Sequence, residues 1–380
     1  MDSIAGKKST LVWAVHISVV ALVLLWLFPT LGLFVSSFRT GDQITNSGWW
    51  ASLATQERQL PAVRISGEEE VGEDGLFVIE GALFADTSAD VSAWGSSARA
   101  PEAYAPGEIV DLDDGVTLSV DAVGNFTLTG PESFEGQRLP RIFTTATVPP
   151  EFTIANYERV LFSGTADAGV GRAFINTATV AIPATVIPIL IAAFAAYALA
   201  WMEFPGRALL VAFIVALLVV PLQLALIPLL SMHNTIGIGK GYIGTWMAHT
   251  GFGMPLAIYL LRNYMVGLPR DIIESAKVDG ATDFQIFTKI VLPLSFPALA
   301  AFAIFQFLWT WNDLLVALVF LGTDDETLVL TGRLVNLLGS RGGEWEILAT
   351  SAFVSIAVPL LVFFAMQRFL VRGLLAGSVK

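Results

Sequence analysis

Six apolar runs, each about as long as a lipid bilayer is thick, constrain the fold of this chain more than any other feature. A transmembrane helix needs roughly 20 apolar residues. The chain of 380 residues is 54% hydrophobic and 14% charged, and its mean hydropathy is +0.68. We predict a mainly α-helical, polytopic membrane protein whose bundle of six transmembrane helices covers Leu11–Val35, Ala173–Leu199, Ala208–Leu230, Ile243–Leu261, Leu294–Leu321 and Ile347–Phe369.

The first run admits a second interpretation as a signal peptide, because Lys7 and Lys8 precede it. It is long for a signal peptide, however, and Phe38-Arg39 follows where a small-x-small cleavage site would stand. We therefore expect residues 1–36 to form an N-terminal segment and an uncleaved first transmembrane helix.

A different composition begins after this helix and predicts a second domain. Residues 36–172 hold 21 acidic and 8 basic residues, and their apolar runs are short. Their alternating patterns predict strands, with a turn at Gly124-Asn125. The expected strands are Leu76–Ile79, Ala82–Phe84, Val116–Val120 and Phe126–Thr129. We expect a small β-rich insert domain outside the cytoplasm, over residues 37–170.

Two acidic clusters in the insert, Glu68–Glu70 and Asp111–Asp114, raise the question of calcium binding. Both lack the alternating ligands and the fixed glycine of an EF-hand loop. We interpret them as solvated charge.

Basic residues next to the apolar runs indicate the orientation, because Lys and Arg concentrate on the cytoplasmic side. If the N-terminus lies inside, the short outer loops hold only Lys240, Arg333 and Arg341, and the flanking basic residues otherwise face the cytoplasm. We therefore expect both termini in the cytoplasm and the insert outside. Residues 171–380 then form a core of five helices with a cytoplasmic loop at residues 263–293 and a cytoplasmic tail.

The cytoplasmic loop is the most patterned polar stretch of the chain. Pro269 and Asp271 suit the start of a short helix, and Asp279-Gly280 ends it where a positive φ is cheapest. Thr282 with Gln285 predicts a capping box that opens a second helix, and Pro293 is expected to end that helix. One face of the first helix is expected to hold Ile272, Ile273 and Ala276, and one side of the second Phe284, Phe287 and Val291.

This loop resembles the EAA loop of ABC-importer permeases, the cytoplasmic element that docks on the ATP-hydrolysing subunit. Ser275 stands where that family usually has alanine. The alternative is a solvated helical hairpin with a Glu274–Lys277 surface pair, which would contribute about 0.2–0.5 kcal/mol. The resemblance assigns ATPase docking to Glu274, Ser275, Ala276, Asp279, Gly280, Ile290, Leu292 and Pro293.

The polar residues of the spans argue against transport driven by an ion gradient. Such transporters keep ionisable residues at membrane depth, whereas these spans contain almost none, namely His16, His249 and Asp313 if the ends of the last span are left aside. No phosphate-cradling GxxxxGK[ST] loop occurs either, so the chain cannot itself be a P-loop ATPase. We expect a transport subunit without cofactor or catalytic residues, with ATP-Mg bound by a partner ATPase. The chain has no cysteine, no histidine spacing typical of metal sites and no basic stripe for nucleic acid.

Further segments resemble carbohydrate-importer permeases of the maltose type, whose fold is that of a type I ABC importer permease. They are Asn176–Arg207, PLQLALIPLL, GFGMPLAIYLLRNY and FLWTWNDLLVALVFL, in that order. The ending FLVRGLLAGSVK resembles the tail of the smaller maltose-type permease, and the long external insert is similar to that of α-glucoside importer permeases. The resemblance implies half of a sugar translocation path, coupled to a separate ATPase dimer, a second homologous permease and an extracytoplasmic sugar-binding protein in the inner membrane.

Polar and aromatic residues of the spans are candidates for the sugar path, because aromatic faces and amide or carboxylate groups suit sugar rings and hydroxyls. Trp residues also mark membrane interfaces, and buried amides also bridge helices, so both interpretations stay open. The candidates are Asn176, Gln223, Trp309, Trp311, Asn312 and Asp313, with Thr177 and Thr179 beside them.

The loop Gly322–Glu346 is expected outside the membrane. The resemblance assigns it contact with the binding protein through Asp324, Asp325 and Arg333, and an ordinary polar connector is the alternative. A different function for the whole chain would be a membrane-anchored sensor or assembly protein, in which the external domain is the working part.

Overall fold

The computed structural model describes residues 10–66, 69–71, 75–84, 89–162, 169–340 and 343–376. The chain divides into two compact units, a β-rich insert over Phe38–Thr153 and a helical unit formed by the residues before and after it. The insert was expected to reach residue 170. The structure ends it at Thr153 because α3 (Ala155–Leu161) buries Val160 in the same cluster as Val170 and Ala173 of α4.

The insert contains two antiparallel sheets that share one apolar core. One sheet has the order β1-β9-β2 with β5 also paired to β9, and the other has the order β3-β4-β8-β7-β6. Trp94, Leu118 and Leu128 are fully buried in the shared core. The strands are β1 (Gln56–Gln59), β2 (Val63–Arg64), β3 (Glu69–Val71), β4 (Phe77–Ala82), β5 (Asp90–Gly95), β6 (Ile109–Asp113), β7 (Val116–Val120), β8 (Asn125–Gly130) and β9 (Arg141–Val148). A short helix α2 (Gly41–Asn46) and a 3-10 turn η1 (Trp49–Ala51) precede them.

The predicted strands of the insert are confirmed in part. The hairpin of β7 and β8 has its turn at Gly124, whose φ of +91° favours glycine. The two strands expected at Leu76–Ile79 and Ala82–Phe84 are instead one strand, β4. Its ladder with β8 continues without a break from Phe77 to Ala82, so Leu83 and Phe84 lie beyond its end.

The helical unit contains three helices that are long and apolar enough to span a membrane, and up to five spans if each of two bent helix pairs counts as one. The three are α1 (Thr10–Ser36), α4 (Val170–Trp201) and α14 (Trp345–Ala376), which include the predicted first, second and sixth spans. The expected fourth span lies in α7 (Tyr242–Val266), a 25-residue helix that is not among the apolar ones. The predicted count of six spans is therefore not reached among the described residues.

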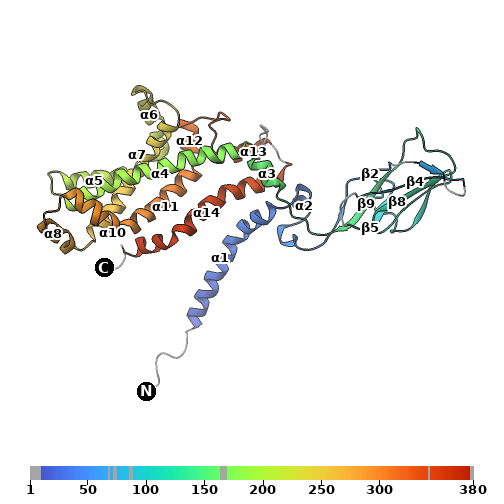
Figure 1. The fold of residues 1–380 in the computed structure, drawn as a ribbon, viewed down its shortest axis with the longest axis horizontal. Helices are drawn as coiled ribbons and strands as arrows, with labels where there is room; N and C mark the ends of the chain where they lie inside the picture. Colours follow the sequence, from blue (N-terminus) through green and yellow to red (C-terminus); the bar gives the residue numbers. More distant parts are fainter. Residues whose placement is uncertain are drawn as a thin grey trace, which may run out of the picture. The chain divides into compact units, whose positions relative to one another are not determined.

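The third and fifth predicted spans are broken helices. The third consists of α5 (Arg207–Leu217) and α6 (Leu222–Thr235), bent by 108° where Pro221 lacks an N–H to continue the first helix. The fifth predicted span is divided into α11 (Phe296–Asn312) and α12 (Leu315–Phe320), and α13 (Leu330–Ser340) follows in the next loop. The second bent pair joins α11 to the preceding helical segment Asp283–Leu294 at 70°. Figure 1 places α8 (Arg270–Val278) and α10 (Leu292–Leu294) at one end of this unit and α12 and α13 toward the other.

Candidate functional site

The loop between α7 and α11 forms the two helices that its sequence predicts. Asp279 ends α8, and Gly280 follows with a φ of +80°, in the left-handed region expected there. Thr282 then caps α9 (Asp283–Ile286) in a complete capping box with Gln285. The helix continues through the π-helical turn η2 (Phe287–Val291) and α10, so the expectation that Pro293 ends it is wrong. The chain turns instead at Ser295, and the segments on its two sides are bent by 70°.

The inner faces of these helices belong to the core of the helical unit. Ile273, Ile286, Phe287 and Val291 are buried, and they cluster with residues of α4, α7 and α11. Ala276, Ile290 and Leu292 pack against the same cluster from partly buried positions.

The outer faces expose apolar side chains, two of which the sequence analysis grouped on one face with buried residues. Ile272 is 42% exposed although Ile273 beside it is buried, and Phe284 is 65% exposed although Phe287 is buried. Val278 is 88% exposed at the end of α8. Adjacent residues on a helix differ by about 100° in direction and residues three apart by about 60°, so the grouping was too coarse to separate the two faces. We refer to Ile272, Val278 and Phe284 as the outer apolar face of the loop.

The polar residues assigned to docking lie on the exposed side of the loop. Glu274, Ser275, Asp279 and Pro293 are all exposed. The Lys277 ammonium lies 3.8 Å from a carboxylate oxygen of Asp283. Lys277 therefore pairs with Asp283, whereas the sequence analysis considered a pair with Glu274. A groove of about 210 Å³ lies beside α8 and is lined by Ala200, Trp201, Glu203, Arg207, Val266, Arg270, Ile273, Glu274 and Lys277.

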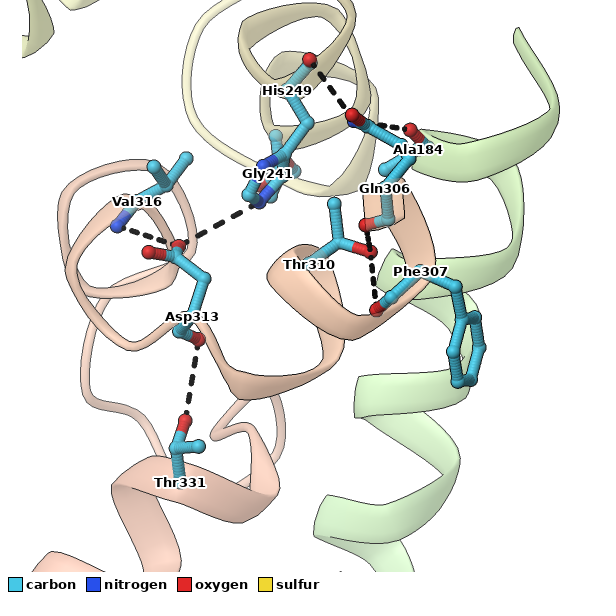
Figure 2. A network of polar contacts seen from close by, with 10 residues as sticks. Ala184, Gly241, His249, Gln306, Phe307, Thr310, Asp313, Val316 and Thr331 are labelled. Carbon is cyan, nitrogen blue, oxygen red and sulfur yellow. Dashed lines mark hydrogen bonds and ion pairs between the residues drawn. The ribbon is translucent and has the colours of Figure 1, made fainter. Parts of the chain in front are cut away.

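Deeper in the helical unit, a polar network joins α7 to the break between α11 and α12 (Figure 2). The Nε2 atom of His249 lies 3.7 Å from Oδ2 of Asp313, and both side chains are nine-tenths or more buried. The same Oδ2 accepts a hydrogen bond of 2.9 Å from the backbone N–H of Val316 and so caps α12. The backbone carbonyl of Asp313 accepts from the Thr331 hydroxyl of α13 at 3.3 Å.

Gln306 extends this network to α4 and was not singled out from the sequence. It is 2% exposed, and its Nε2 donates to the backbone oxygens of Ala184 at 3.0 Å and His249 at 3.5 Å. Gly253 permits the close approach, because a Cβ there would lie 2.6 Å from Oε1 of Gln306. The sequence did contain a signal for this residue, because Gln306 is the one amide in the apolar run FAIFQFLW and a buried polar residue in a span needs a partner.

Asn176 and Thr177 of α4 form hydrogen bonds to the backbone of the segment that leads into α13. The Asn176 amide donates to the backbone oxygens of Glu326 at 2.8 Å and Leu328 at 3.0 Å, and its Oδ1 accepts from the Tyr242 hydroxyl. Thr177 Oγ1 accepts from the backbone N–H of Leu330 at 2.7 Å. The neighbouring hydroxyl of Thr179 donates within its own helix.

The remaining path candidates lie in different surroundings. Trp311 is 2% exposed, stacks on Phe307 and donates its indole N–H to the Ser355 carbonyl. Trp309 meets the His249 ring edge to face, with centroids 5.3 Å apart. Asn312 is exposed and bonds within its helix, and Gln223 is exposed in the first turn of α6. The structure thus brings Trp309 and Asp313 together around His249, and it does not place Gln223 in this network.

In the loop expected to meet the binding protein, Asp325 pairs with Arg333. Arg333 Nη2 donates to Asp325 Oδ1 at 2.9 Å, with the arginine side chain 11% and the aspartate side chain 78% exposed. Asp324 is exposed, and its carbonyl accepts from the N–H groups of Thr327 and Leu328. No group of three or more potential metal ligands occurs within the described ranges.

Comparison with known proteins gives a consistent result. Residues 173–375 match the family model described as binding-protein-dependent transport system inner membrane component. The chain is 62% identical over 380 residues to the alpha-glucoside transport system permease protein AglG of Rhizobium meliloti (strain 1021), with 99% of both chains covered. It is 57% identical over 230 residues to the osmoprotective compounds uptake permease protein GgtD of Synechocystis sp., covering 60% of this chain and 76% of that protein.

Among solved structures, a bacterial ABC transporter involved in the import of the acidic polysaccharide alginate contains a chain with a similar fold. The TM-score is 0.57 at 16% sequence identity, and the match covers 96% of this chain and 99% of that chain. At this identity the likeness concerns the fold.

Proposed function

This chain belongs to the family of inner membrane components of binding-protein-dependent transport systems, and we propose that it carries α-glucosides into the cell. It is a multi-pass membrane protein with the fold of a type I ABC importer permease. It is a transport subunit and no enzyme, since ATP hydrolysis resides in a separate chain in related systems.

One observation supports α-glucosides as the substrate more than any other. The identity of 62% to the α-glucoside permease extends over 99% of both chains and so includes the insert. The match to the permease for osmoprotective compounds covers 60% of this chain. Osmoprotective compounds are the second candidate substrate class on that ground. The sensor alternative has no comparable support, because it does not explain the matched core.

We assign the coupling to ATP hydrolysis to the loop with α8 and α9. Its exposed residues Glu274, Ser275 and Asp279 and its outer apolar face would contact an ABC ATPase dimer, which holds ATP-Mg. Exposed apolar side chains on a loop of a membrane protein fit a protein partner, because water does not favour them. A second homologous permease would complete the path, and an extracytoplasmic sugar-binding protein would deliver the sugar near Asp324, Asp325 and Arg333.

The transport cycle follows from these contacts. Closure of the ATPase dimer would move α8 and α9, and their buried faces would move α4, α7 and α11 with them. Access would then alternate between the two sides of the membrane around a path near the midplane. Among the path candidates, Trp309 and Asn312 keep accessible side chains beside the α11–α12 break, whereas Asn176 and Trp311 have their polar atoms bonded to the protein.

We further propose that both termini lie in the cytoplasm and the insert outside. The docking elements and the α12–α13 region lie toward opposite ends of the helical unit, as this orientation requires (Figure 1). A reporter fused after Gly124 is expected to be active outside the cytoplasm, and one fused after Gly280 inside. The opposite labelling would overturn the orientation and the dock together.

The substrate class is tested by uptake in the producing organism. Deletion of this chain should abolish the binding-protein-dependent uptake of labelled α-glucosides such as sucrose and trehalose, and re-expression should restore it. Uptake of a β-linked disaccharide serves as the control and should be unchanged. If α-glucoside uptake survives the deletion and salt tolerance is lost instead, the osmoprotective class replaces the proposal.

A further inference from the structure

The two points at which the chain leaves the insert lie next to each other. The backbone N–H of Thr153 donates to the carbonyl of Phe38 at 2.8 Å, and Gln43 Nε2 donates to the carbonyl of Glu151 at 3.2 Å. The membrane-spanning helix α1 ends at Ser36, two residues before Phe38. A span of two residues reaches at most about 7 Å, so this end of the insert must begin close to the membrane surface.

The same end of the insert carries large exposed apolar side chains. Leu53 is 81%, Trp50 71% and Phe152 51% exposed. The segments that carry them are neighbours in the fold, because one polar pocket is lined both by Ala51 and Ser52 and by the chain leaving β9 at Val148, Pro149 and Pro150. We refer to Trp50, Leu53 and Phe152 as the neck patch.

We propose that the neck patch is a lipid-binding surface that dips into the headgroup region of the bilayer leaflet on the insert's side. The choice of lipid over a protein partner rests on the chain's own connectivity, which holds the patch near the bilayer whatever the insert does. It also rests on residue type, because Trp favours the membrane–water interface, where its ring is half solvated.

The charged residues of this region fit the headgroup level rather than the hydrocarbon core. Asp42 on α2 and Glu151 beside Phe152 are exposed and would stay in water or among headgroups. The guanidinium of Arg39 is turned inward, where it donates to the carbonyls of Gln43 and Ser47 and to the Ser47 hydroxyl. The patch therefore combines an apolar surface with polar neighbours, as interfacial segments do.

The absence of cysteine in the natural sequence permits a direct test. The assembled transporter would carry a single cysteine, Leu53→Cys, labelled with a nitroxide and reconstituted in vesicles of phosphatidylethanolamine and phosphatidylglycerol. Collision rates with oxygen, which partitions into lipid, and with a water-soluble nickel chelate then report depth. Val71→Cys is the matched control, because Val71 is 67% exposed and pairs with Phe77, which pairs with Gly130 at the end of β8 opposite the β7–β8 turn.

The expected result is an oxygen-to-nickel collision ratio at position 53 that is severalfold higher than at position 71. Equal ratios at the two positions would overturn the proposal. A label at position 53 that is immobilised and shielded from both reagents would show a protein interface and would also overturn it. Phe152→Cys repeats the measurement on the other side of the neck, and retained uptake shows that each labelled protein is folded.

Discussion

The imidazole of His249 and the carboxylate of Asp313 face each other across 3.7 Å in the interior of the helical unit. Both are among the ionisable residues that the sequence analysis named in the spans, and 63 intervening residues of the chain separate them. The fold gathers them at the break between α11 and α12, where Asp313 also caps α12 (Figure 2). Ionisable side chains are rare inside membrane bundles, so this position is a candidate for mutational tests.

The cap made by Asp313 predicts a difference between two substitutions. Asp313→Ala removes the acceptor for the Val316 N–H and should lower the free energy of unfolding by about 0.5–2 kcal/mol. Asp313→Asn keeps an acceptor oxygen and should be closer to the wild type. Thermal unfolding of the purified complex in detergent measures the order. An alanine variant as stable as the wild type would show that the cap contributes nothing.

The backbone of Gly280 predicts a position-specific loss of ATPase binding. Gly280→Val must adopt a left-handed conformation, which disfavours a β-branched residue by about 1–2 kcal/mol. Gly237→Val is the control, because Gly237 has a φ of +82° and open space as Gly280 does, but it lies between α6 and α7. Only the Gly280 variant should fail to co-purify with the ATPase. Equal losses in both variants would point to general misfolding.

Charge and apolar exposure on the loop predict a second loss of coupling. Glu274→Arg should remove a charged hydrogen bond to a basic residue of the ATPase, worth about 1.5–3 kcal/mol. Val278→Asp should weaken the same contact through the outer apolar face. In both, uptake is lost and membrane insertion is retained. Glu132→Arg, an exposed acid of the insert, should leave uptake intact, and normal uptake by the Glu274 variant would refute the dock.

The docking loop and one hairpin of the insert could be predicted from the sequence, whereas the extent of β4 could not. Local signals were sufficient for the docking loop, because a capping box and a left-handed glycine depend on neighbours within four residues. The β7–β8 hairpin was predictable for the same reason. The strand count around β4 was not, since only the ladder with β8 shows that Glu80 and Gly81 continue the strand.

The hydropathy pattern and the residue types could not predict contacts between residues that are distant in the sequence. Hydropathy alone predicts one span over α5 and α6, although the chain bends by 108° between them. Trp309 and Trp311 are two residues apart, but the ring of Trp309 contacts His249, whereas Trp311 stacks on Phe307. Residue type marked both as candidates, and only packing distinguishes them.

The turn between β7 and β8 predicts a pH dependence of the insert. Burial raises the pKa of Asp121, but hydrogen bonds from Asn125 and from turn N–H groups outweigh it and hold the pKa below its usual value of 3.8. A carboxylate with a depressed pKa stabilises the fold above its unfolded pKa, and this stabilisation is lost as the pH falls through the folded pKa. Amide protection of the hairpin should therefore drop below about pH 4.

The matched variant for this test is Asp121→Asn, which cannot ionise. The amide protons of the hairpin should be less protected in this variant than in the wild type near neutral pH. In acid, the protection should be the same in the two proteins. Hydrogen exchange corrected for the intrinsic rate at each pH measures this difference. A difference that persists unchanged in acid would exclude the carboxylate as its source.

The adjacent ends of the insert predict that it can be removed. Joining Phe38 to Thr153 through a short glycine-serine linker should leave a folded helical unit, because these residues already share a backbone hydrogen bond. If the insert recruits the binding protein, uptake should slow at low binding-protein concentration while basal ATPase activity persists. If it supports the first helix, the complex should dissociate in detergent. Unchanged uptake and assembly would leave the insert without either role.

The burial of Ile273, Ile286, Phe287 and Val291 has a mechanical consequence. These side chains are part of the same close-packed interior as α4, α7 and α11, and such interiors are nearly incompressible. If the ATPase docks on this loop as proposed, a displacement of α8 would therefore move α4, α7 and α11 with it, because the packed interior between them could absorb little of the motion.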